Sequence, residues 1–418
     1  FARDYDKAAS LYEALLADYP FEMEARHLLA NTYWGQYKAK DAVRELQTLA
    51  VEEPQNEVIW STLGSYLLDI GDFERAQPAL ERYAKLAPDD ANSYALLGDS
   101  HRFRGQYQAA RDQYMLALAI DPNMRTVAAS LATIAYLEGN YEAAEQGFAA
   151  IVADQSLIIS ERLDAMFSLQ ALLAARGHFT AADSLLTQFS EALKEERIRE
   201  AMATSIRALL QLELGNQASA RELATSAISL SPGVPTRYLF SRGLVELYFQ
   251  EYEKVFATAA ELISFALPID DPDRTEERAA AYLSGMAWLA KGDLAQAETE
   301  LRKASNLEGY TYRIYDLGLA RLLMQKNQTD EALELVRLSV LPEKVEPRID
   351  LEPERVRAIL LCAEIQRQAG ASRVAEQIAN EFLIRFDKAP ASNPDSMLAR
   401  EIIANIGLAK TSTEKKGD

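Results

Sequence analysis

The chain has 418 residues, of which 49% are hydrophobic and 26% are charged, a balance typical of a folded globular protein. Its formal net charge of −19 at pH 7 argues against a nucleic-acid partner, because binding to phosphate backbones requires clustered Lys and Arg. No apolar run approaches the roughly 18 residues that a membrane-spanning helix needs, so we expect no membrane insertion within the chain. Cys362 is the only cysteine, which excludes a disulfide within the chain, favours a reducing cytoplasmic compartment and leaves a bacterial periplasmic one open.

Residues 1–156 carry a regular repeat. The stretch Trp60–Pro88 returns with almost unchanged spacing as Tyr94–Pro122. Glycines that interrupt the helical pattern recur every 34 residues, at Gly71, Gly105 and Gly139. Between them, apolar residues recur at three- and four-residue steps, so each period is predicted to hold two antiparallel amphipathic helices joined by a glycine turn. Phe1 lies inside a repeat, and we therefore expect the chain to be a piece of a longer protein.

Small residues at fixed positions predict how the two helices of a pair pack. Small side chains let two helix axes approach closely, and large neighbours fill the remaining space. In the regular pairs the first helix carries Ala30, Gly64, Gly98 or Ala132, and the second helix carries Ala42, Ala76, Ala110 or Ala144. A proline then ends each pair, since it cannot continue a helix.

The repeat becomes longer and less regular over residues 157–392. Turn glycines now lie 38 and then 77 and 78 residues apart, at Gly177, Gly215, Gly292 and Gly370. Gln170 stands where a small residue is expected, and the turn near Asn327 has no glycine. Four extra residues equal about one helical turn, so either some helices are a turn longer or the loops between repeats have grown. In all, we expect a leading half repeat and ten helix pairs.

Residues 393–418 are predicted to close the array. The stretch Asn393–Ala409 has the pattern of a capping helix. The last nine residues, KTSTEKKGD, are polar and charged, and we expect them to be disordered.

The regular repeats resemble the tetratricopeptide repeat. The resemblance rests on Trp60, Leu63, Gly64, Gly71, Phe73, Ala76, Leu80 and Pro88. It is close over residues 1 to about 155 and recognisable to about residue 390. It implies an all-α fold, a right-handed α-solenoid of stacked antiparallel helix pairs. Since one pair cannot bury its apolar face alone, such a repeat is structural, and its product is a long curved surface on which any function must lie.

In this family the first helix of each pair lines the concave face, where peptides bind. The resemblance therefore implies a set of partner-binding residues: His27, Asn31, Trp34, Asp99, Arg102, Phe103, Thr133 and Tyr136. Aromatic rings can anchor a peptide, but in a tightly wound array they can also pack against neighbouring repeats. Both alternatives stay open for Trp34, Phe103 and Tyr136, while self-packing is favoured in the degenerate half. The family's Lys, Asn and Arg clamp for C-terminal carboxylates is not matched, because Thr62 and Leu96 occupy two of its positions.

No pattern for catalysis or cofactor binding is present. His27, His101 and His178 fall in three different repeats, with no HExxH motif and no Cys–His cluster. Phosphate loops, dinucleotide fingerprints and GxSxG are absent. The acidic stretch Asp270–Glu277 lacks the ligand spacing and central glycine of a calcium loop. We expect no catalytic residue, no cofactor and no metal.

We interpret the chain as a non-catalytic scaffold or adaptor that holds a protein or peptide partner along its concave face. A second interpretation stays open. Tyr282–Ala304 resembles, loosely, the repeat regions at the C-terminal end of bacterial Ser/Thr kinases and winged-helix regulators. That resemblance implies the sensory or interaction arm of a larger multidomain signalling protein.

Overall fold

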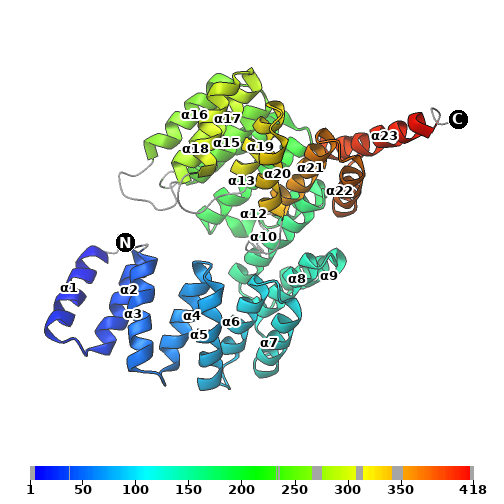
Figure 1. The fold of residues 1–418 in the computed structure, drawn as a ribbon. Coiled ribbons are helices and arrows are strands. Elements are labelled where there is room, and N and C mark those ends of the chain that lie inside the picture. The colour runs from blue at the N-terminus through cyan, green and yellow to red at the C-terminus, as the bar shows by residue number, and fades with distance from the viewer. Residues whose placement is uncertain are drawn as a thin grey trace. The chain divides into compact units, whose positions relative to one another are not determined.

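The computed structural model is all-α over the residues that it describes, which are 5–36, 38–231, 233, 236–265, 275–306, 314–340 and 352–414. The chain divides into two compact units, unit 1 (Phe1–Gly147) and unit 2 (Phe148–Asp418) (Figure 1). The division falls inside a helix, whereas the sequence analysis placed the change of repeat type after residue 156. The predicted half repeat and ten helix pairs are present among the described residues.

Unit 1 begins with the half repeat, the single helix α1 (Tyr5–Asp18). Four pairs follow: α2 (Met23–Gly35) with α3 (Ala39–Glu52), α4 (Glu57–Asp69) with α5 (Phe73–Leu86), α6 (Ala91–Phe103) with α7 (Tyr107–Ile120), and α8 (Arg125–Leu137) with α9 (Tyr141–Ala153). Side chains satisfy the free amides at several helix starts. Asn56 Oδ1 accepts from the Val58 amide at 3.1 Å, and Asp90 Oδ1 accepts from the Asn92 amide at 2.9 Å.

The predicted role of the small residues is confirmed at two glycines of unit 1. A Cβ atom at Gly64 would lie 2.4 Å from Leu80, and one at Gly98 would lie 2.4 Å from Tyr114. Both of these large side chains are fully buried. The first helix of a pair therefore needs glycine here, because its backbone rests directly against a large side chain of the second helix.

Unit 2 contains six further pairs and a final helix. Its helices are α10 (Ile159–Ala175), α11 (Phe179–Gln188), the short α12 (Ser190–Leu193), α13 (Arg197–Glu213), α14 (Gln217–Leu230), α15 (Thr236–Tyr248), α16 (Tyr252–Phe265), α17 (Thr275–Lys291), α18 (Leu294–Asn306), α19 (Ile314–Gln325), α20 (Thr329–Val340), α21 (Glu352–Gln368), α22 (Ser372–Arg385) and α23 (Pro394–Glu414). The final helix extends past Ala409 to Glu414, so the prediction of disorder is wrong for residues 410–414, and residues 415–418 lie outside the described part.

The longer repeat of unit 2 comes in part from longer first helices. The first helices α10, α13, α17 and α21 have 17 residues, against 13 in α2, α4, α6 and α8. Two turns of unit 2 lack the expected glycine. There Gln250 and Asn327 take up the left-handed conformation themselves, each with φ of 59°. The repeat geometry is thus kept at two turns that have lost their glycine.

The first helices of unit 2 form a closed series. Helices α13, α15, α17, α19 and α21 contact one another in order, and α21 also contacts α10, the first helix of the first pair. Arg199 of α13 completes the circuit by donating to the Ser160 carbonyl of α10 at 3.2 Å. Unit 2 is therefore a ring of helix pairs, in which the last pair packs against the first.

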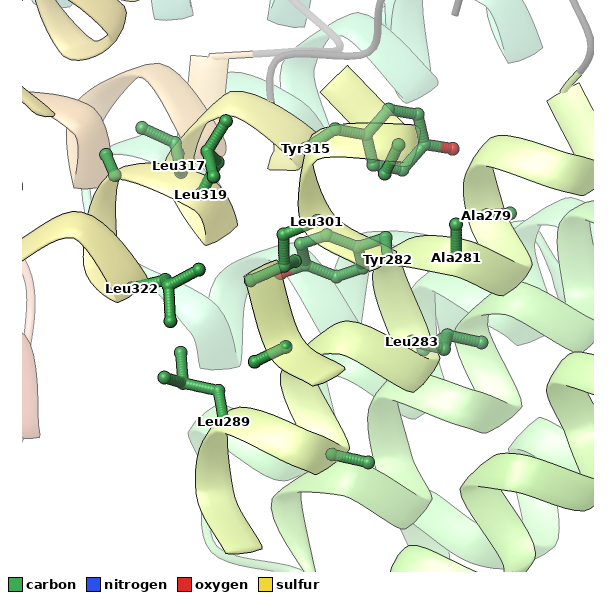
Figure 2. Packing of buried hydrophobic residues seen from close by; sticks show 14 of the residues in the cluster. Ala279, Ala281, Tyr282, Leu283, Leu289, Leu301, Tyr315, Leu317, Leu319 and Leu322 are labelled. Atoms are coloured by element: carbon green, nitrogen blue, oxygen red, sulfur yellow. The ribbon is translucent and has the colours of Figure 1, made fainter. Parts of the chain in front are cut away.

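The core of unit 2 lies between these first helices and their partners (Figure 2). Three aromatic rings from successive first helices meet there. Tyr282 and Tyr315 have ring centroids 5.5 Å apart, and Phe240 lies 5.9 Å and 6.1 Å from them. Aromatic side chains of the degenerate repeats thus join neighbouring pairs to one another.

Candidate functional site

The candidate site is the set of accessible polar side chains on the first helices of unit 1. We call it the first-helix surface and define it by Asn31, Ser65, Asp69, Asn92, Asp99 and Thr133. Helices α4, α6 and α8 contact one another in order, and α2 reaches α4 through side chains. Residues at equivalent repeat positions therefore follow one another along this face.

Trp34 and Asn31 of α2 meet the next repeat at Tyr66. The Trp34 and Tyr66 rings are stacked, with centroids 3.9 Å apart and an interplanar angle of 11°. The Tyr66 hydroxyl donates to Asn31 Oδ1 at 2.8 Å, and burial, with a smaller contribution from Asp69, raises the pKa of that hydroxyl. Trp34 therefore packs between repeats, while Asn31 remains exposed.

Asp99 is the centre of a polar network that joins three helices. Its Oδ1 accepts from the Tyr114 hydroxyl of α7 at 2.7 Å and from the Arg102 guanidinium of α6 at 3.0 Å. Ser130 of α8 lies at the outer limit of a hydrogen bond, 3.5 Å from the same oxygen. The network therefore fixes the spacing of two consecutive repeats as well as the direction of Asp99.

Arg102 is held firmly within this network. Its side chain is only 12% exposed and forms an ion pair with Asp99. Burial lowers the pKa of Arg102, but Asp99 and Tyr114 raise it by more, so the guanidinium stays charged. The guanidinium carbon of Arg102 lies 4.2 Å from the ring centroid of Phe103. The Phe103 ring in turn stacks on that of Phe73, with centroids 5.2 Å apart. Arg102 and Phe103 thus support the surface more than they project from it.

The remaining predicted residues differ in accessibility. Thr133 is half-buried, and its hydroxyl donates to the Ala129 carbonyl at 3.0 Å. His27 is half-buried, and burial lowers its pKa against a smaller opposing effect of Glu53, which favours the neutral ring at pH 7. Tyr136 is only 4% exposed, with its ring 5.4 Å from that of Tyr141. Its assignment to an accessible binding surface is therefore corrected, because it is a core residue.

Sequence reasoning missed the partners that hold these side chains. Tyr66 and Phe73 were not identified as neighbours of the site, although both stack on predicted residues. Trp34 and Tyr66 do not occupy equivalent positions of the 34-residue repeat, so repeat spacing does not signal their contact. The hydrogen bond from the Tyr114 hydroxyl to Asp99 was not predicted either.

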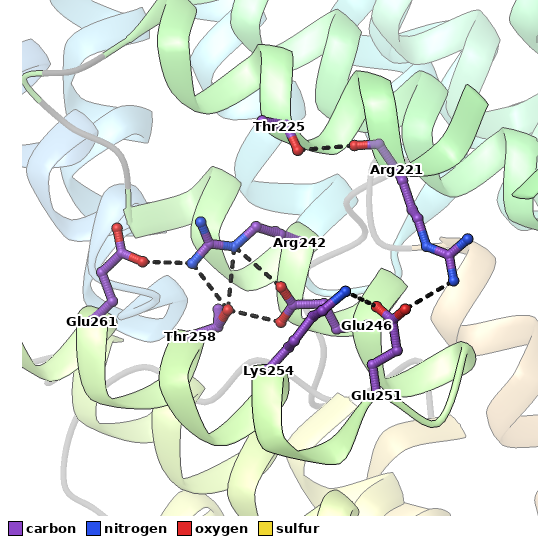
Figure 3. Close-up of polar contacts among 8 residues, drawn as sticks. All are labelled: Arg221, Thr225, Arg242, Glu246, Glu251, Lys254, Thr258 and Glu261. Atoms are coloured by element: carbon purple, nitrogen blue, oxygen red, sulfur yellow. Dashed lines mark hydrogen bonds and ion pairs between the residues drawn. The ribbon is translucent and has the colours of Figure 1, made fainter. Parts of the chain in front are cut away.

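Unit 2 offers a different kind of polar cluster. Arg242 donates to the Thr258 hydroxyl at 2.9 Å and pairs with Glu246 and Glu261, at 3.5 Å and 2.5 Å (Figure 3). Burial raises the pKa of Glu246 more than Thr258 and Arg242 lower it. Arg242 and Glu246 of α15 thus contact Thr258 and Glu261 of α16, so the cluster connects the two helices of this pair.

Within the described ranges, no group of three or more His, Cys, Asp or Glu side chains is placed to hold a metal ion. Most of the acidic stretch Asp270–Glu277, residues 270–274, lies outside those ranges. None of the helices in the described part of the chain is both long enough and apolar enough to cross a membrane.

Comparison with known proteins identifies the repeats. Two tetratricopeptide repeat family models match the chain, over residues 2–66 and 61–125. The general transcriptional corepressor ssn6 of Schizosaccharomyces pombe is 29% identical over 126 residues, which are 30% of this chain and 11% of that protein. The formate-dependent nitrite reductase complex subunit NrfG of Escherichia coli O157:H7 is 28% identical over 133 residues, which are 31% of this chain and 65% of that protein. The chain thus spans less than two thirds of either relative.

Among solved structures, a tetratricopeptide repeat protein from Parabacteroides merdae aligns with 75% of this chain and 98% of its own, at 15% identity and a TM-score of 0.40. The two family matches run without a gap from residue 2 to residue 125, over the same pairs that show the 34-residue period and the buried glycine contacts. Residues 2–125 of the chain therefore consist of tetratricopeptide repeats.

Proposed function

We propose that the chain is a non-catalytic interaction scaffold that binds a protein or peptide partner along the first-helix surface of unit 1. The partner contacts would be Asn31, Ser65, Asp69, Asn92 and the accessible edges of Asp99 and Thr133. Small polar groups at regular intervals can pair with the main chain of a bound segment, and their rigid helices keep the entropic cost of binding low.

One observation carries the proposal, namely the different use of first helices in the two units. In α4, five of 13 residues are buried, which leaves a polar face accessible. In unit 2 the share is higher in α10, with ten of 17 residues, and in α19, with eight of 12, whereas α15, with five of 13, resembles α4. A helix that is buried on most sides serves a core, whereas one with a single buried stripe leaves the other face available. Unit 1 is therefore the better candidate for binding.

The relatives support the same class of function. One is named as a transcriptional corepressor and the other as a subunit of a reductase complex, and each matches about a third of this chain. Their names connect tetratricopeptide regions with regulation and with assembly. We extend to this chain only the general role of holding another protein.

The experiment is an affinity capture with the full chain and a surface variant. Asn31→Arg together with Asn92→Arg places two bulky cations on exposed positions of α2 and α6. We expect the double variant to lose specific partners that the unmodified chain captures, as measured by quantitative mass spectrometry. Circular dichroism should show an unchanged melting temperature.

The matched control is Ala119→Arg, an exposed position on the second helix α7. It adds the same side chain away from the first-helix surface and should leave the captured proteins unchanged. Identical captured proteins for all three chains would contradict the proposal. Loss with the control alone would move the binding surface to the second helices.

A further inference from the structure

The ring of unit 2 has one interface that the chain does not cross. Every other pair is joined to the next by a covalent connection, but the last pair meets the first only through non-covalent contacts. We call this interface the seam and define it as the contact of α10, α11 and their turn with α21 and the α22–α23 loop. Its two sides lie far apart in the sequence, since Arg176 and Asp387 are separated by 211 residues.

An ion pair between a buried arginine and a partly exposed aspartate lies at the centre of the seam. Arg176, at the C-terminal end of α10, is 5% exposed. Its guanidinium donates to both carboxylate oxygens of Asp387 at 2.7 Å, and its Nε donates to Oδ1 at 3.1 Å. The Lys388 amide donates to the Arg176 carbonyl at 3.1 Å. Side chain and main chain of one residue are thus both bound to the opposite side of the seam.

Close packing surrounds this pair. Gly177 has φ of +77°, and a Cβ atom there would lie 2.4 Å from Ala389 Cβ. Next to it, Phe179 and Phe386 meet edge to face with centroids 5.8 Å apart, and both are buried. The α10–α11 turn therefore fits the α22–α23 loop as a small, dense contact.

A second ion pair ties the end of the ring to α13. Arg357 of α21 pairs with Glu213, the last residue of α13, and its Nε lies 3.1 Å from Asp395 of α23. These contacts also join residues distant in sequence, because Glu213 and Arg357 are 144 residues apart. Polar contacts thus join the end of the ring to α10 at the seam and to α13 beside it.

We infer that unit 2 opens at the seam in a discrete step, before its other helix pairs separate from one another. In a repeat array, stability is approximately a sum of terms for each repeat and for each neighbouring interface. Opening at the seam breaks one interface and leaves the covalently connected ones intact. The open form exposes first-helix faces that the ring covers, so a ligand for those faces would bind the open form and shift the population towards it.

The test is hydrogen exchange by mass spectrometry on the full chain at low concentrations of denaturant. In the unmodified protein, we expect amides of α10, α11, the α22–α23 loop and α23 that exchange through opening to share one opening event, at lower denaturant than amides of α14–α18. Asp387→Asn should speed exchange in the first set by at least about tenfold and leave the second set unchanged. Equal acceleration of both sets, or a single opening event for all of unit 2, would overturn the inference.

The single native cysteine supplies an independent readout. Cys362 of α21 packs against the core cluster that α21 shares with α15–α20, so its thiol should stay protected when only the seam opens. We expect Asp387→Asn to react with a thiol reagent at the rate of the unmodified chain. If thiol reactivity rises in parallel with hydrogen exchange, the variant unfolds unit 2 as a whole. The denaturant dependence of exchange in the unmodified chain then decides whether the seam opens separately.

Discussion

Units 1 and 2 are built from the same kind of helix pair, but unit 1 leaves its first helices accessible and unit 2 encloses them. In unit 1 the first helices have 13 residues, of which four to six are buried in each helix. In unit 2 most first helices have 17 residues and are buried on several sides, and the last pair returns to the first. Whether a repeat array presents a surface or encloses a core therefore depends on the apolar width and length of its first helices, more than on the contacts within a pair.

The largest effect is expected from Gly98→Leu, which tests the tight pairing assumed for unit 1. A side chain at this position must displace Tyr114, because even a Cβ would lie 2.4 Å from it. We expect unit 1 to lose about 3 kcal/mol of unfolding free energy, as overpacking of a dense core does. Calorimetry should show a lower transition for unit 1 and an unchanged one for unit 2. The exposed control Thr126→Leu should shift neither, and equal stability of the two variants would refute the pairing.

A sharper comparison is offered by two glycines of unit 2 with the same backbone conformation. Gly177 and Gly215 both have φ of +77°. A Cβ at Gly177 would lie 2.4 Å from Ala389 Cβ across the seam, whereas one at Gly215 would meet nothing within 4 Å. Gly215→Ala should cost about 1 kcal/mol through backbone strain, and Gly177→Ala about 2 kcal/mol more through overpacking. Denaturant unfolding measures both. Equal losses would mean that the seam contributes nothing to the stability of unit 2.

Tyr114→Phe separates the structural role of Asp99 from a binding role. The variant keeps the ring against Gly98 and removes the hydroxyl that donates to Asp99. We expect unit 1 to lose about 1–2 kcal/mol, because the hydroxyl donates to Asp99 and also accepts from Arg102 Nε. Unfolding followed by tyrosine and tryptophan fluorescence would measure it. No change in stability together with a loss of captured partners would place Asp99 in binding alone.

The smallest effect on stability is expected at Asn31→Ala. Asn31 is exposed, and its bond from Tyr66 lies at the surface, so the loss should stay under about 0.5 kcal/mol. If the first-helix surface binds a partner, the same variant should weaken that binding measurably, for example by titration calorimetry with the captured protein. A large stability loss with unchanged affinity would assign Asn31 to packing.

The sequence was sufficient to predict what repeats at a fixed interval. The helix pairs, the glycine contacts at Gly64 and Gly98, and the count of repeats all follow from spacing, because each depends on residues close along the chain. The seam does not, since Arg176 and Asp387 occupy positions that no repeat pattern relates. The burial of Tyr136 was also not predicted. Repeat spacing gives the position of a residue in its helix, but it does not give the exposed fraction of its side chain.

The seam has a consequence for how such a chain can change over evolution. Unit 1 can gain or lose a 34-residue copy by duplication or deletion, since each added pair needs only a neighbour to stack on. Unit 2 cannot, because one copy more or fewer would move Arg176 away from Asp387 and Glu213 away from Arg357. Contacts between its first and last pairs thus fix the number of repeats in unit 2. Point substitution remains as its route of divergence, which agrees with the replacement of turn glycines by Gln250 and Asn327.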